Sequence, residues 1–302
     1  MSLPNFYIVG AAKSGTSSLW GYLNQHPDIF MSNPKEPNFM VFENMKMPAF
    51  KGPISKEILL TKIYNNTITD FNKYKSLFDD VKNEKVIGEA SVRYLYFNKA
   101  IDNIRKHTPD AKIIIILRNP VDRLYSHYCM MKRYLLEPLD LRNAMDAQES
   151  RMKDQWGWDW HYLKVGEYFE QVSRYYKAFS SNQIKVFIYE DFKRYPKKTI
   201  EEMYDFLGVS TSFNPDFSTK YQVGYWPKSF KIYRYLSGAS ASLMFIKRLL
   251  PGFLYYRAIA FIKNLNKGKM PLMNKEDREF FEEYYASDKK KLEGLLKRPL
   301  PW

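Results

Sequence analysis

Several features that constrain function are scarce in this chain of 302 residues, beginning with cysteine. The single cysteine, Cys129, excludes an intramolecular disulfide and a multi-cysteine zinc site, and it indicates a reducing compartment. The longest aliphatic run, Ile113 to Leu117, is far shorter than the roughly 18 residues that a membrane helix needs. The chain opens on a strand-like run, Phe6 to Val9, rather than on a signal peptide. We therefore expect a cytoplasmic protein without a membrane span.

Acidic residues are missing from one long segment. Residues 217–275 contain no Asp or Glu but eleven Lys and Arg, and the whole chain has a formal net charge of +14. The rest of the chain therefore carries only +3. Such a segment could bind a solvated anion, a nucleic acid or an anionic membrane surface. An equally good explanation of its charge is that it forms the solvated face of amphipathic helices.

Short buried strands alternate with helices along most of the chain. This order predicts a parallel sheet, so we expect an α/β fold with a P-loop-like parallel β-sheet flanked by helices and a helical C-terminal region, all in a single domain, 1–302. The proline-rich residues 31–56 are expected to be loop, and the last third is expected to lack strands. Strands are predicted at 5–9, 85–88, 112–117 and 184–189, and helices at 17–25, 122–134, 166–179, 196–207 and 275–297.

The segment GAAKSGTSS, residues 10–18, connects the first predicted strand to the first predicted helix. A helix start offers unpaired N–H groups and a positive dipole end, and glycines let the backbone approach an anion, so this segment suits a phosphate cradle. In a nucleotide-binding P-loop the Lys follows the second Gly, whereas here Thr16 has that place and the Lys is Lys13. The changed position of the Lys argues against a magnesium-dependent nucleoside triphosphatase. It favours a protein that binds an anionic ligand and neutralises it with its own cations.

A second predicted anion site follows the most apolar strand. Arg118 comes directly after residues 112–117, and Ser126 lies in the next predicted helix, eight residues on. Ligands of open parallel sheets bind at the carboxyl ends of strands, and an Arg with a hydroxyl group suits a terminal phosphate.

These two motifs resemble those of the sulfotransferases that use 3′-phosphoadenosine 5′-phosphosulfate, in their heparan-sulfate-type and bacterial branch. KEPNF at 35–39 is similar to a third motif of that branch, and weaker similarities run through most of the chain. Two family features are absent: Ala90 stands where heparan-type enzymes often have Lys, and Cys129 has no partner for their disulfide-bounded C-terminal loop. The resemblance implies that nucleotide contacts come from Lys13, Ser14, Gly15, Thr16, Ser17, Ser18, Arg118 and Ser126.

The same resemblance implies metal-independent, in-line transfer of a sulfuryl group to an acceptor hydroxyl or, less readily, an amine, leaving adenosine 3′,5′-bisphosphate. Lys13 would stabilise charge on the leaving phosphate and Glu36 would be the base. The four histidines are weaker candidates for the base, and His127 is expected to pack against the site or support it. We expect a carbohydrate acceptor first, and a lipid, alkaloid or polyketide hydroxyl as alternatives. The expected walls of the acceptor site are residues 41–85, 156–161 and 237–269, and the basic segment 217–275 is a candidate lid or acceptor-binding region that includes Lys228.

Two other classes of function stay open at this stage. A P-loop kinase or nucleoside triphosphatase would need magnesium, and the chain lacks both its Lys position and an acidic end on its best strand. A non-enzymatic binder of a polyanion or a membrane surface would use the mixed aromatic and basic residues of 217–275.

Overall fold

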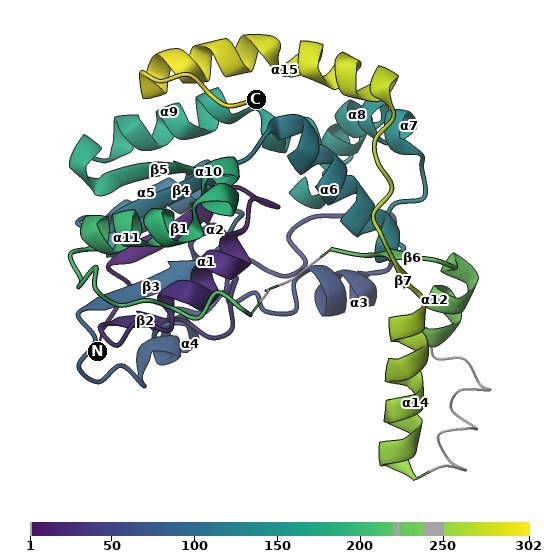
Figure 1. Ribbon diagram of the computed structural model, residues 1–302, viewed down its shortest axis with the longest axis horizontal. Helices are drawn as coiled ribbons and strands as arrows, with labels where there is room; N and C mark the ends of the chain where they lie inside the picture. Colours follow the sequence, from purple (N-terminus) through teal and green to yellow (C-terminus); the bar gives the residue numbers. More distant parts are fainter. Residues whose placement is uncertain (1, 220, 222–223, 238–250) are drawn as a thin grey trace.

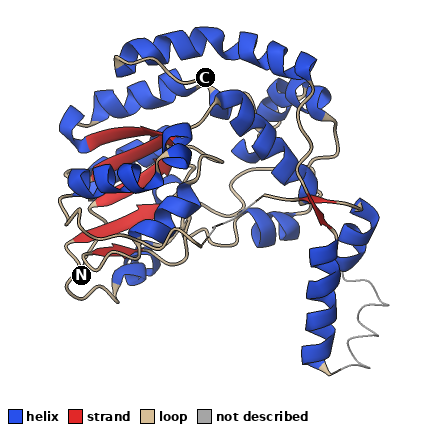
Figure 2. Ribbon diagram, in the orientation of Figure 1, coloured by secondary structure: helices blue, strands red, loops and turns tan. Residues whose placement is uncertain are grey.

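A five-stranded parallel sheet with the strand order β2-β3-β1-β4-β5 forms the centre of the molecule (Figures 1 and 2). The structure is a computed structural model that describes residues 2–219, 221, 224–237 and 251–302. The predicted α/β class with a parallel sheet flanked by helices is confirmed. The strands of this sheet are β1 (Phe6–Gly10), β2 (Ile29–Met31), β3 (Val86–Ala90), β4 (Lys112–Leu117) and β5 (Ile184–Ile188).

Both faces of the sheet are covered by helices, which is why its strands are mostly apolar. In β1, Phe6 and Ile8 face a core shared with α1 (Thr16–Leu23) and α11 (Pro196–Leu207). The alternate residues Tyr7 and Val9 face the other core, which contains α5 (Asn98–His107) and α9 (Tyr168–Ala178). The long helix α15 (Lys275–Leu296) packs across α9 and α6 (Pro120–Arg133) on that second side. Ile115 lies in the central strand β4 and is fully buried. Its replacement by Ala should therefore lower the free energy of unfolding by about 2–5 kcal/mol.

The first strand, β1, lies at the centre of the sheet. The next two strands along the chain, β2 and β3, lie on one side of it, and β4 and β5 lie on the other side. β1 pairs with β3 on one edge and with β4 on the other, and Gly10 lies opposite Ile115. The loops that follow β1 and β4 therefore leave from neighbouring positions at the same end of the sheet. Such a reversal of strand order opens a crevice between the two loops, which is the usual ligand position in open α/β sheets.

Most predicted elements are confirmed within a few residues, but β2 was not predicted and the expectation for residues 31–56 is wrong. Residues 31–56 are not all loop, because Met31 belongs to β2 and α2 (Phe39–Phe42) is a buried turn of helix. Its sequence, FMVF, is too short for a helical period to be visible, and the fold buries it completely. Helices without a counterpart in the prediction are α3 (Lys56–Ile58), α4 (Phe71–Lys75), α5, α7 (Leu141–Asp146), α8 (Gln148–Lys153), α10 (Tyr189–Arg194), α12 (Phe230–Ser237) and α14 (Gly252–Leu265).

A separate arm projects from the body near the C-terminal third (Figure 1). It contains α12, α14 and two short antiparallel strands, β6 (Trp226–Pro227) and β7 (Lys267–Gly268). The expectation that the last third lacks strands is therefore wrong, although each strand has only two residues. No helix within the described ranges is long and apolar enough to cross a membrane.

Candidate functional site

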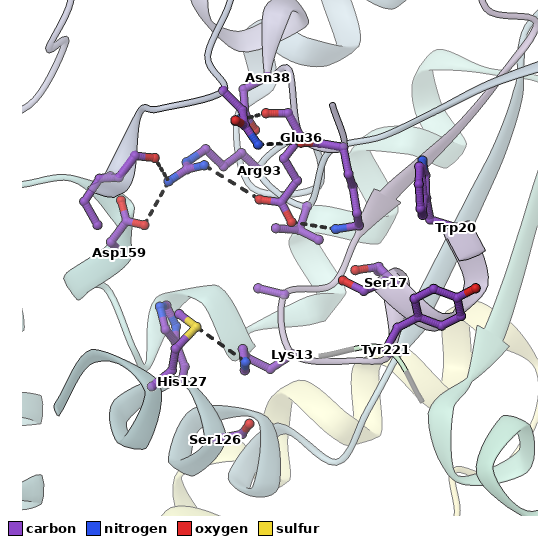
Figure 3. Close-up of a pocket in the computed structure, with 18 of the residues that line it drawn as sticks. Lys13, Ser17, Trp20, Glu36, Asn38, Arg93, Ser126, His127, Asp159 and Tyr221 are labelled. Atoms are coloured by element: carbon purple, nitrogen blue, oxygen red, sulfur yellow. Dashed lines mark hydrogen bonds and ion pairs between the residues drawn. The ribbon is translucent and has the colours of Figure 1, made fainter. Parts of the chain in front are cut away.

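A cleft of about 730 Å³ opens at the carboxyl ends of β1 and β4 (Figure 3). Its lining comes from the β1–α1 loop, from the loop before α2, from α6 and from the segment before α9. All but one of the predicted site residues line this cleft. They are Lys13, Gly15, Thr16, Ser17, Ser18, Glu36, Arg118 and Ser126.

Ser14 is the exception among the predicted residues. Its side chain is completely buried and does not line the cleft. Its hydroxyl has no hydrogen-bond partner within the described part of the chain. The hydroxyl of Ser14 is therefore not placed to meet a ligand, and only its backbone N–H remains as a candidate donor.

The β1–α1 loop has a backbone shape that requires glycine at its end. Gly15 has φ 84° and directly precedes α1, so it lies in the left-handed region that favours glycine. A Cβ at this position would lie 2.9 Å from Cε2 of Tyr189, which leaves no room for a side chain. Residues of the first turn of α1, Thr16 to Ser18, line the cleft. This turn carries no acidic residue, so no carboxylate neutralises the positive end of the helix dipole there.

Lys13 is a poorly solvated cation within the cleft. Its Nζ lies 3.4 Å from Sδ of Met130 on α6, which is a weak acceptor (Figure 3). Burial lowers the pKa of Lys13 to about 8, and the positive charges of Arg133 and Arg118 contribute to the same shift. An anion beside Nζ would reverse this shift, because an opposite charge favours the charged form. Binding of an anion beside Lys13 is therefore electrostatically favourable.

Arg118 joins the two predicted anion-binding motifs. Its Nη1 donates a hydrogen bond of 3.0 Å to the carbonyl oxygen of Lys13, 105 positions earlier in the sequence. Its guanidinium also lies 5.0 Å from the ring centroid of Tyr189, a distance at which cation–π attraction orients the group. Ser126 lies in the second turn of α6 and lines the same cleft. The loop after β1 and the residues after β4 thus form one continuous cationic surface.

Glu36 lies across the cleft from this cationic surface. Its Oε1 accepts a bond of 2.6 Å from Nζ of Lys35, and its Oε2 is 4.0 Å from Nη1 of Arg93. Burial alone would raise the pKa of Glu36, but Lys35, Arg93 and Lys13 outweigh burial and hold this pKa below its usual value. Glu36 is therefore an ionised acceptor at neutral pH, ready to receive a hydrogen bond or a proton.

A buried network under Glu36 fixes its loop. Nδ2 of Asn38 donates a 2.7 Å bond to the carbonyl oxygen of Glu36, and the backbone N–H of Asn38 donates to Oγ of Ser91 at 3.1 Å. Ser91 in turn donates to Oε1 of Glu89 at 2.5 Å. Burial raises the pKa of Glu89 to about 7, although hydroxyl donors from Ser91, Tyr74 and Tyr94 oppose that shift. Both Glu36 and Asn38 have positive φ, so the network maintains an uncommon backbone shape.

An ion pair that the sequence analysis did not identify forms another wall of the cleft. Nη2 of Arg93 lies 2.9 Å from Oδ1 of Asp159, and both side chains are buried. The Arg93 guanidinium also lies 5.1 Å from the ring centroid of Trp158. Oδ2 of Asp159 and Nε1 of Trp158 have no hydrogen-bond partner within the described residues. Arg93, Trp158 and Asp159 all line the cleft, so this ion pair forms a buried polar wall beside Glu36.

His127 lines the cleft but is held neutral. Burial, followed by the charge of Arg123, lowers the pKa of His127 well below its usual value. Its Nδ1 lies 3.3 Å from Nη1 of Arg123, and its ring packs 5.1 Å from that of Tyr162. These contacts agree with the expected supporting role. Across the described ranges, no group of three or more His, Cys, Asp or Glu has a metal-binding arrangement.

The predicted walls of the acceptor site are present for two of the three segments. Lys62, Asn65 and Asn66 from 41–85 line the cleft, as do Trp158 and Asp159 from 156–161. From the described part of 237–269, no residue lines it. The candidate lid, residues 217–275, contributes little to the cleft. Among its described residues only Tyr221 lines the cleft, and Lys228 does not.

Comparison with known proteins agrees with this geometry. A family model described as a sulfotransferase domain matches residues 3–223. The crystal structure of a sulfotransferase from Alicyclobacillus acidocaldarius is 34% identical, with a TM-score of 0.75 over 99% of this chain and 98% of that one. The sulfotransferase domain from the curacin biosynthetic pathway is 14% identical, with a TM-score of 0.52 over the full length of both chains, and shares the fold.

Among curated proteins, similarity extends to larger enzymes. The bifunctional heparan sulfate N-deacetylase/N-sulfotransferase 4 of Mus musculus is 26% identical over 99% of this chain and 31% of its own length. Carbohydrate sulfotransferase 15 of Mus musculus is 26% identical over 68% of this chain and 44% of its own length. The chain thus spans less than half the length of these curated relatives. On the family match and the full-length structural similarity, the chain belongs to the sulfotransferase family.

Proposed function

We propose that this enzyme transfers the sulfuryl group of 3′-phosphoadenosine 5′-phosphosulfate to an acceptor hydroxyl. The observation that carries the proposal is the 3.0 Å bond from Arg118 Nη1 to the carbonyl oxygen of Lys13. It places two cationic sites, from different strands, side by side in one cleft. The donor nucleotide carries anionic groups at both its 5′ and 3′ positions, which matches two such sites.

The residues present fit this donor. Lys13 and the open N-terminus of α1 suit the 5′-phosphosulfate, because both offer positive charge within the cleft. Arg118 and Ser126 suit the 3′-phosphate, with a guanidinium fork and a hydroxyl donor. When bound, the donor supplies the sulfuryl group. The protein supplies cations where charge develops on the leaving phosphate, and we therefore propose that the reaction needs no metal.

Glu36 is the proposed base for the acceptor hydroxyl. It lines the cleft opposite Lys13 and is ionised at neutral pH. Its low pKa makes it a modest base, so it serves best late in proton transfer, once the acceptor oxygen has begun to lose electron density to the sulfuryl group. The Glu89 network positions Glu36 for this role through Ser91 and Asn38.

A carbohydrate is the proposed acceptor class. Asn65 and Asn66 offer amide donors and acceptors, and Trp158 offers an indole face beside the buried Asp159. Sugars present hydroxyl groups and C–H faces that suit such a wall. The relatives support the same acceptor class, because one is a heparan sulfate N-deacetylase/N-sulfotransferase and another is a carbohydrate sulfotransferase.

The test is a transfer assay with radiolabelled donor nucleotide and a panel of acceptors. The panel contains a desulfated heparan oligosaccharide, a simple phenol and a long-chain alcohol, each with and without EDTA. We expect label in the oligosaccharide, unaffected by EDTA, and loss of transfer in Lys13→Ala but not in the exposed control Lys106→Ala. Label only in the phenol or alcohol would contradict the acceptor class, and abolition by EDTA would contradict the proposed independence from metal.

A further inference from the structure

The arm contains a helix, α14, with many apolar side chains that are exposed to solvent in the described part of the chain. None of the 14 residues of α14 is buried. Phe253 and Phe261 are each 64% exposed, although a helix that is apolar on most sides normally lies within a core or a membrane. Large apolar side chains of α14 that are exposed to solvent are Phe253, Leu254, Tyr256, Phe261, Ile262 and Leu265.

The base of the arm is a built structure, so this exposure is not that of a loose tail. Asn266 is buried where β6 and β7 meet, and its side chain exchanges two hydrogen bonds with the backbone of Ser229, at 2.8 and 3.0 Å. The backbone N–H of Lys228 donates to the carbonyl oxygen of Asn266 at 2.8 Å. The base also meets the body, because the Arg133 guanidinium lies 4.6 Å from the ring centroid of Tyr225.

The charge of the arm restricts what can cover it. Residues 217–275 have no acidic residue, and the described basic residues include Arg234 on α12 and Arg257 and Lys263 on α14. A second copy of the chain would bring the same charge to the same surface, which disfavours pairing of two arms. A nucleic acid would match the charge but would leave Leu254, Ile262 and Leu265 in water. An anionic lipid bilayer satisfies both groups of side chains.

We propose that the arm docks on the surface of an anionic lipid bilayer. The 14 residues of α14 span about 21 Å, less than the roughly 30 Å of a hydrocarbon core, so the helix suits a position along the interface. In that position Phe253 and Phe261 enter the acyl boundary. Arg257 lies between them on the same face of the helix, so its aliphatic stem lies along the apolar surface while its guanidinium extends to the lipid headgroups. Ile232 and Tyr235 of α12 are also exposed and extend the apolar surface. Docking does not depend on the transfer reaction, so the failure of one proposal leaves the other standing.

The experiment measures co-sedimentation of the full chain with phosphatidylcholine vesicles, with and without phosphatidylglycerol, over a range of salt concentrations. We expect binding to the anionic vesicles that is at least about tenfold stronger than to neutral ones and that weakens with salt. The double variant Phe253→Ser and Phe261→Ser should lose at least about tenfold in binding. Its matched control, Met152→Ser with Tyr195→Ser, removes exposed apolar side chains from the body and should bind like the unmodified chain.

A second pair of variants tests the charges. Arg257→Gln with Lys263→Gln should weaken binding to anionic vesicles, whereas Lys197→Gln with Lys198→Gln on the exposed face of α11 should not. Since all these side chains lie on the surface, each variant should keep the circular dichroism spectrum and melting temperature of the unmodified chain. Equal binding of the arm variants and their controls would overturn the proposal. So would a dimer in sedimentation equilibrium that Phe253→Ser with Phe261→Ser converts to monomer, or arm-dependent binding to duplex DNA without binding to vesicles.

Discussion

The guanidinium of Arg118 donates a hydrogen bond to the carbonyl oxygen of Lys13 at 3.0 Å, although the two residues are 105 positions apart. The bond exists because β1 and β4 are neighbours in the sheet and both loops leave from the same end. It ties the residue proposed to contact the 3′-phosphate to the backbone of the residue proposed to contact the 5′-phosphosulfate. The spacing between the two sites is therefore fixed by the sheet itself.

Gly15→Ala should weaken nucleotide binding and destabilise the protein. The new Cβ would lie 2.9 Å from Tyr189 at a residue with φ 84°, so we expect a loss of about 1–3 kcal/mol in unfolding free energy and at least about tenfold weaker binding of adenosine 3′,5′-bisphosphate. Urea denaturation and calorimetric titration measure the two effects. Gly294→Ala is the control, because a Cβ at that exposed helical site meets nothing within 4 Å, and it should be neutral or stabilising. Equal effects at both glycines would refute the role of the loop shape.

Glu36→Gln should reduce kcat by about 100-fold or more, because the amide cannot accept the acceptor proton. Affinity for adenosine 3′,5′-bisphosphate should stay constant or rise slightly, since the change removes a negative charge that interacts with Lys13. The neighbouring cations hold the pKa of Glu36 below its usual value, so the acidic limb of the pH–rate profile of the unmodified enzyme should lie below the normal range for Glu. Glu57→Gln changes an exposed carboxylate and serves as the control. Full turnover by Glu36→Gln would place the base elsewhere.

Nucleotide affinity should fall as pH rises above the pKa of Lys13. Burial lowers that pKa to about 8, so the unliganded protein loses the positive charge above this pH, whereas the phosphates are ionised throughout because their second pKa is about 6. Calorimetric titration of adenosine 3′,5′-bisphosphate between neutral pH and strongly alkaline pH measures the slope. Lys13→Arg keeps its charge and should show a flat profile over the same range. A slope that is the same in both proteins would show that Lys13 is not the titrating group.

Glu89→Gln should change the pH dependence of stability. The folded-state pKa of Glu89, about 7, is above the ordinary value of 4.5, so the folded protein binds more protons than the unfolded chain between these values. The unmodified protein should therefore lose up to about 3 kcal/mol as pH rises from about 4.5 to about 7, relative to the variant. Urea denaturation at both ends of this window measures the difference, and other titrating groups cancel in the comparison. Parallel stability curves would contradict the raised pKa.

The sequence predicted four of the five strands of the central sheet, missing the short β2, and it predicted the cationic side of the cleft, because these features depend on local patterns. The run of β4 is uninterrupted and apolar, and the glycine-containing loop lies directly between a strand and a helix. The proximity of this loop to Arg118, which follows β4, could be predicted from the parallel order of the strands alone. All residues assigned to the nucleotide except Ser14, which is fully buried, were therefore found to line one cleft.

The opposite wall could not be predicted from local patterns. Arg93 and Asp159 are 66 positions apart and belong to no recognisable motif, so only the fold reveals their ion pair. The network from Glu89 to Glu36 was equally hidden, since Ser91 and Asn38 meet across 53 positions. Buried polar contacts of this kind depend on side-chain geometry that a sequence pattern does not carry. The helix α14 is a further case, because it was not predicted from the sequence and its exposed apolar side chains are evident only in the structure.

One measurement tests the central claim most directly: calorimetric titration of the protein with adenosine 3′,5′-bisphosphate and with adenosine 5′-monophosphate. Arg118 and Ser126 line the cleft beside Lys13, so the unmodified protein should bind the bisphosphate at least about tenfold more tightly, a difference of about 1.4 kcal/mol. Arg118→Ala should abolish this preference, and Arg105→Ala, on the exposed face of α5, should retain it. Equal affinity of the unmodified protein for the two nucleotides would contradict the account.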